Sequence, residues 1–148
     1  MDRKTFLKST AAMLAAAACA PISMVLEGCA PSGRILHVAV VNRKAVVPLA
    51  SLPDLAPPNS YAKLYLGQFP NPVIMFALES GEIGAVLSTC SHSGCEVKKL
   101  RTKFECPCHG SEYDLQGNVL RGPAPAPLET FNVQKFSDRV EFLLEGPP

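Results

Sequence analysis

Short apolar runs separated by turn residues make up most of the chain beyond residue 34. Val, Ile, Leu and Phe are common in these runs, which is typical of β-strands, and no stretch there shows sustained helical periodicity. Strands are predicted at Ile35–Val41, Ala45–Leu49, Ala62–Leu66, Val73–Leu78 and Ile83–Ser88, and a hairpin is predicted from Thr130–Phe136 and Arg139–Leu144. The pattern therefore predicts an all-β fold, a sandwich or barrel.

The composition agrees with a fold rich in turns. The 148 residues include 14 prolines and 10 glycines, which favour turns and short strands over a helical bundle. Asn42, Arg43 and Lys44 are predicted to join the first two strands as a hairpin, and the proline-rich segment Leu52–Ser60 is predicted to be a loop. The formal net charge of +1 gives no reason to expect a nucleic-acid partner.

Residues 1–29 have the layout of an export signal or membrane anchor, because a basic start is followed by an apolar stretch. Asp2–Lys8 resembles a twin-arginine signal with Lys4 in place of the second arginine, and an ordinary Sec signal is the alternative. Leu26-Glu27-Gly28-Cys29 looks like a lipobox, which predicts a lipid on Cys29. An uncleaved transmembrane helix over Ser9–Leu26 and a cleaved, soluble product are the other interpretations. Residues 30–34 are predicted to be a linker.

Two cysteine–histidine boxes carry the chemistry of this chain. The first box is Cys90-Ser-His92-Ser-Gly-Cys95, and the second box is Cys106-Pro-Cys108-His109-Gly-Ser111. Two Cys and two His in mixed pairs can hold a [2Fe–2S] cluster with sulfur on one iron and nitrogen on the other. The same residue types can hold a structural zinc ion or contribute only disulfides. Gly94 and Gly110 permit backbone turns that larger residues resist, so the boxes are expected on loops at one end of the sheets.

The boxes resemble the C-x-H-x-G-C and C-P-C-H-G-S motifs of Rieske iron–sulfur proteins. The resemblance implies one [2Fe–2S] cluster per chain, with Cys90 and Cys106 on one iron and His92 and His109 on the other. It also implies a Rieske-type antiparallel β sandwich or barrel over residues 35–148. Within that domain, the resemblance places a small cluster-binding β subdomain at about residues 89–128.

The resemblance further assigns the residues around the cluster. Cys95 and Cys108 match a disulfide that ties the two boxes together, and Gly122-Pro123-Ala124 matches a loop that covers the cluster. Ser111 and Tyr113 match positions whose hydroxyls, in cytochrome bc-type members, donate hydrogen bonds to a bridging sulfide and to a cysteine sulfur. Such bonds stabilise the reduced cluster and raise its potential, which implies the high-potential branch of the family.

The function implied by this resemblance is electron transfer as one subunit of a larger complex, rather than catalysis by this chain alone. The chain would accept electrons from quinol and pass them to a c-type cytochrome, beside a cytochrome b-type subunit. It would lie on the periplasmic, outer face of the bacterial cytoplasmic membrane, anchored by its N-terminus. The small Rieske subunit of a periplasmic molybdenum oxidase of the arsenite oxidase kind is the alternative. A non-redox binding module stabilised by zinc or a disulfide is the second alternative.

Four basic residues lie between the first and second boxes, at Lys98, Lys99, Arg101 and Lys103. A cluster of this kind is usually a solvated face, and the other interpretation is a docking surface for an acidic partner. Both interpretations predict that the four side chains are exposed.

Overall fold

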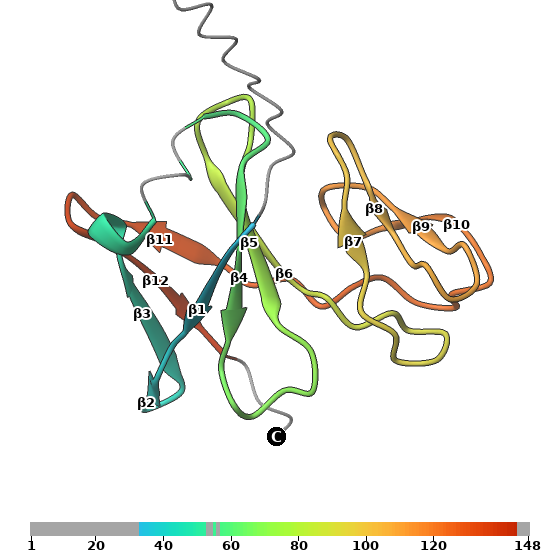
Figure 1. Cartoon of the computed structure of the whole chain (residues 1–148), viewed down its shortest axis with the longest axis horizontal. Coiled ribbons are helices and arrows are strands. Elements are labelled where there is room, and N and C mark those ends of the chain that lie inside the picture. Colours follow the sequence, from blue (N-terminus) through green and yellow to red (C-terminus); the bar gives the residue numbers. More distant parts are fainter. Residues whose placement is uncertain (1–32, 53–54, 56, 145–148) are drawn as a thin grey trace, which may run out of the picture.

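The computed structural model describes residues 33–52, 55 and 57–144, and this part of the chain is all-β (Figure 1). Its strands form three sheets of 4 strands each. A short 3-10 turn, η2, lies at Leu49–Ser51. The predicted all-β fold is therefore confirmed.

Two of the sheets form the base of the molecule, and the third forms a small lobe beside it (Figure 1). The first base sheet has the order β1 (Arg34–His37), β4 (Tyr61–Tyr65), β5 (Val73–Ala77) and β6 (Ile83–Leu87). The second base sheet has the order β11 (Val133–Lys135), β12 (Arg139–Leu143), β3 (Lys44–Pro48) and β2 (Val40–Val41). The small lobe has the order β10 (Val119–Arg121), β9 (Glu112–Tyr113), β8 (Phe104–Glu105) and β7 (Lys98–Lys99).

The prediction of one strand at Ile35–Val41 is wrong, because the chain changes sheets within this run. Its first part, β1, pairs with β4 in a parallel arrangement, whereas the prediction was antiparallel throughout. Its last part, β2, pairs with β3. The backbone turns between β2 and β3 at Asn42 and Arg43, whose φ angles are 51° and 61°. Two consecutive positive φ values suit the twist of a tight hairpin.

Strand β5 lies between the two hydrophobic cores and is buried along its whole length. Because side chains alternate along a strand, Val73 and Met75 enter the core of the base, whereas Ile74 and Phe76 enter the core of the small lobe. Gly84 of β6 pairs with Phe76, and a Cβ atom at this glycine would lie 2.5 Å from the Phe76 ring. Burial of both faces explains why β5 has no polar residue.

Lys99, one of the lysines between the boxes, packs against the core of the small lobe. Lys99 is only 9% exposed, since it points inward from β7 while its neighbour Lys98 points to solvent. Its Nζ atom donates to the carbonyl oxygens of Leu100 and Arg101 and lies 5.4 Å from the centroid of the Phe76 ring. Burial lowers the pKa of Lys99. The prediction that all four basic side chains are exposed is therefore wrong.

The predicted export signal, the lipobox ending at Cys29 and the alternative helix at Ser9–Leu26 lie outside the described residues. Among the residues that are described, no helix has the length and apolar character needed to cross a membrane.

Candidate metal centre

The two boxes are loops with the same backbone construction. In the first box, the Cys90 N–H donates to the Cys95 carbonyl at 2.9 Å, and the Gly94 N–H donates to the Cys90 carbonyl at 2.8 Å. In the second box, the N–H groups of Cys106 and Gly110 donate to the carbonyls of Ser111 and Cys106 at 2.8 and 2.9 Å. Gly94 and Gly110 both have a φ of 75°, a conformation that L-residues rarely adopt.

The four side chains that could ligate a metal are divided between the interior and the surface. Cys90 and Cys106 are free thiols with exposed fractions of 1% and 0%. His92 and His109 are exposed, and their ring centroids lie 4.7 Å apart. A [2Fe–2S] cluster with mixed ligation needs thiolates on one iron and imidazoles on the other. The donor set therefore fits this cluster, with a sulfur side inside the protein and a nitrogen side at its surface.

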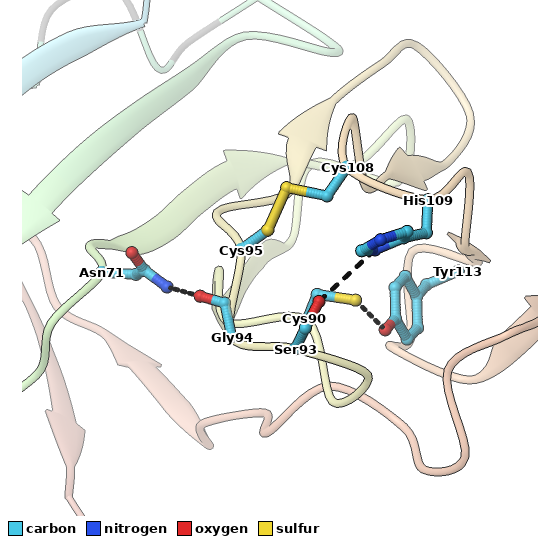
Figure 2. Close-up of a disulfide and its surroundings, with 8 residues drawn as sticks. All are labelled: Asn71, Cys90, Ser93, Gly94, Cys95, Cys108, His109 and Tyr113. Carbon is cyan, nitrogen blue, oxygen red and sulfur yellow. Dashed lines mark hydrogen bonds between the residues drawn. A yellow bond between two sulfur atoms is a disulfide. The ribbon is translucent and has the colours of Figure 1, made fainter.

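A disulfide joins Cys95 of the first box to Cys108 of the second box (Figure 2). It leaves Cys90 and Cys106 as the free thiols among the described residues. The Cys106 sulfur lies within 4.8 Å of both disulfide sulfurs. Cysteine binds a metal as its thiolate. Of these three cysteines, Cys106 is therefore the only one that can bind iron. The disulfide ties the two loops together beside the ligands.

The surroundings of Cys90 favour its thiolate form. Burial opposes ionisation, but hydrogen bonds from the Tyr113 hydroxyl, the His92 backbone N–H, Cys106 and Ser111 outweigh it and lower the pKa of Cys90. The Tyr113 hydroxyl donates to the Cys90 sulfur at 3.2 Å (Figure 2). Burial and this same bond raise the pKa of Tyr113. Tyr113 thus remains a protonated donor while Cys90 becomes a better ligand.

Two serine hydroxyls hold the proline-rich segment 122–127 against the boxes. The Ala124 N–H donates to the buried Ser111 hydroxyl oxygen at 3.0 Å. The Ser91 hydroxyl donates to the Ala126 carbonyl at 2.6 Å and accepts from the Ala126 N–H at 3.2 Å. Ala124 is buried, whereas Gly122 and Pro123 are exposed. Ser111 accepts a backbone bond in this arrangement, which leaves its own proton available to donate toward Cys90.

Sequence reasoning missed several residues that position the first box. Ser91 and Ser93 occupy unassigned positions of the motif, and the Ser93 hydroxyl lies 3.4 Å from His109 Nδ1. From the base, Lys63 of β4 forms an ion pair with Glu96 at 2.5 Å, and Asn71 contacts Gly94 at 2.8 Å. Single polar residues in loops and strands carry no motif, so the sequence offered no signal for these contacts.

Comparisons with known proteins agree with this donor set. The Rieske [2Fe-2S] domain family matches residues 45–132. The match covers more than half of the chain, and the chain belongs to this family. The predicted family and the predicted cofactor, one Rieske [2Fe–2S] cluster, are confirmed. The family match gives no support to the zinc or disulfide-only alternatives.

Similar proteins include cytochrome b6-f complex iron-sulfur subunits. That of Chlorobaculum tepidum is 32% identical over 99 residues, which are 66% of this chain and 51% of the relative. That of Prochlorococcus marinus (strain AS9601) is 43% identical over 74 residues, 47% of this chain and 42% of the relative. The chain thus spans about half the length of these curated relatives.

A solved structure is also similar in fold and sequence. It is the plasma membrane Rieske protein PetC3 from Synechocystis PCC 6803, with 35% identity and a TM-score of 0.52. The match covers 65% of this chain and 94% of that protein.

Proposed function

We propose that Cys90 and Cys106 bind one iron of the Rieske cluster and that His92 and His109 bind the other. The buried position of the two thiols and the mutual contact of the two exposed imidazoles support this assignment. Cys95 and Cys108 form a disulfide with each other, so their sulfurs are not available as ligands, and the proposed ligand set does not require them. The cluster supplies one-electron redox chemistry, and the chain holds it with its nitrogen side toward the solvent.

We further propose that the protein transfers electrons from quinol to a c-type cytochrome, as the iron–sulfur subunit of a cytochrome bc-type complex. The observation that carries this proposal is the pair of exposed imidazoles that the two boxes bring together. An exposed imidazole can form a hydrogen bond with a quinol hydroxyl, which brings the electron donor next to the cluster. The two boxes and the 122–127 segment carry no Asp, Glu, Lys or Arg, which suits an apolar quinol site.

The names of the curated relatives support a partner of the cytochrome b type, since those proteins are subunits of cytochrome b6-f complexes. We propose the same kind of partner for this chain, on the periplasmic face of the bacterial cytoplasmic membrane. Attachment through the N-terminal segment, by a lipid on Cys29 or by the apolar stretch itself, is part of the proposal.

The test is purification of the full chain from membranes of a native or closely related host, under mild detergent. We expect about two irons per chain, a reduced-state electron paramagnetic resonance (EPR) signal with the low average g-value of mixed nitrogen–sulfur ligation, and reduction by added quinol. Co-purification of a b-type cytochrome supports the complex. A large molybdopterin subunit in its place would support the oxidase alternative, and zinc without iron would contradict the cluster assignment.

A further inference from the structure

A short segment of the β4–β5 connection contacts the first box. Asn71 lies between Pro70 and Pro72 in this segment. The Asn71 Nδ2 atom donates to the Gly94 carbonyl at 2.8 Å and to the Thr89 hydroxyl oxygen at 3.1 Å. A single side chain thus reaches the residue before the first box and the turn near its end.

The backbone on both sides of Asn71 is constrained. Proline fixes its own φ angle, and it also restricts the conformation of the residue before it, so Pro70 and Pro72 together limit the backbone at Asn71. The Pro72 carbonyl accepts bonds from the N–H and the hydroxyl of Ser88, at 3.0 and 2.6 Å. The Asn71 amide is therefore presented to the first box from a rigid, anchored position.

The bond to Gly94 sets the direction of the next N–H group. The Gly122–Pro123 bond is the one cis peptide among the described residues, so the Gly94–Cys95 peptide is trans. In a trans peptide the C=O and N–H groups point in opposite directions. Figure 2 shows Asn71 on one side of Gly94, with Cys90 and His109 on the other. The Cys95 N–H therefore points toward the side of the ligands.

We propose that Asn71 is a positioning residue of the redox centre, which orients the Gly94–Cys95 peptide so that the Cys95 N–H donates a hydrogen bond to a sulfur of the bound cluster. This inference rests on the proposed ligand set. A donor near the cluster stabilises the more negative, reduced form and raises the potential. The side-chain hydrogen bonds of Asn71 go to Gly94 and Thr89 rather than to the proposed ligands, so its effect passes through the peptide plane.

The test compares three variants of the full, cluster-containing protein. Asn71→Ala removes the bond to Gly94. Thr89→Val removes the other acceptor of Asn71 but keeps the Gly94 bond. Asn132→Ala is a control at an exposed asparagine in the base. We expect Asn71→Ala to shift the reduction equilibrium about tenfold toward the oxidised form, which is about 59 mV for a one-electron couple. Iron content and EPR g-values should stay close to wild type, and the other two variants should keep the wild-type potential.

A wild-type potential in Asn71→Ala, or an equal fall in Thr89→Val, would overturn the inference while leaving the proposed function intact. A second measurement uses the wild-type protein and so does not depend on whether a variant folds. In the reduced wild-type protein, hydrogen exchange at the Cys95 amide should be slow, and fast exchange would also overturn the inference. A wild-type protein without the Rieske EPR signal would overturn the proposed function, and this inference with it.

Discussion

Replacing Tyr113 with phenylalanine removes a hydroxyl that donates to the Cys90 sulfur at 3.2 Å and leaves the ring in place. The Tyr113 side chain is 0% exposed and belongs to the core of the small lobe. Phenylalanine fills the same space, so the variant should fold and assemble its cluster. The hydroxyl stabilises the reduced, more negative centre more than the oxidised one. Its loss should therefore lower the midpoint potential.

The size of this shift follows from the strength of the bond. A hydrogen bond to a charged group is worth about 1.5–3 kcal/mol. For a one-electron couple, a tenfold change in equilibrium, about 1.4 kcal/mol, corresponds to about 59 mV. Losing the bond in the reduced state alone would thus cost about 60–130 mV. Because the bond is also made in the oxidised state, we expect about half of this, roughly 30–65 mV.

Protein-film voltammetry on the purified protein measures the shift, and EPR of the reduced state checks that the cluster is intact. Tyr65→Phe is the matched control, since Tyr65 lies in the base and stacks on His37. It should keep the wild-type potential. An unchanged potential in Tyr113→Phe, or an equal fall in both variants, would show that the Tyr113 hydroxyl does not act on the redox centre.

Three further predictions concern stability. Ser91→Ala removes both bonds to Ala126 and should shorten the lifetime of the cluster, followed as the loss of visible absorbance at elevated temperature; an unchanged lifetime would exclude a role of Ser91 in closing the loop. Lys99→Met keeps the apolar stem but loses two carbonyl bonds and the contact with Phe76, so unfolding in urea should be easier by about 1–2 kcal/mol at an unchanged potential. The hydrogen bond from Lys103 lowers the pKa of Glu112 below its usual 4.5. The ion pair therefore stabilises the fold above this range, and this stability should be lost as the pH falls from about 4.5 through the lowered pKa. In urea unfolding measured across this pH range, Glu112→Gln should not show this loss of stability. A pH profile identical to that of the wild type would contradict a role for the ion pair.

The base was largely predictable because its strands are long enough to show a pattern. The runs at β4, β5 and β6 contain five residues each, and their apolar character reflects burial on one or both faces. The strands of the small lobe contain only two or three residues, which is too short for a period-2 alternation to be recognised. The parallel pairing of β1 with β4 was also hidden, because sequence alternation does not reveal the direction of a neighbour.

The centre was predictable where it depends on local motifs and hidden where it depends on contacts across the fold. The proposed ligand residues lie within two short boxes whose composition already favoured a metal. By contrast, the Ser91 hydroxyl meets Ala126 across 35 positions of sequence, and Asn71 meets Gly94 across 23. Such pairs exist only once β5, β6 and the small lobe are assembled. The hydrogen bonds around the proposed ligands are thus a property of the tertiary structure.

The two boxes show why residue spacing alone does not define this centre. Their backbones have the same hydrogen bonds and the same turn at Gly94 and Gly110, yet equivalent positions carry different chemistry. The third residue is a histidine in the first box and a disulfide cysteine in the second, and the last residue is a disulfide cysteine in the first and Ser111 in the second. This offset lets one loop scaffold, used twice, supply two buried thiols, two surface imidazoles and a covalent tether.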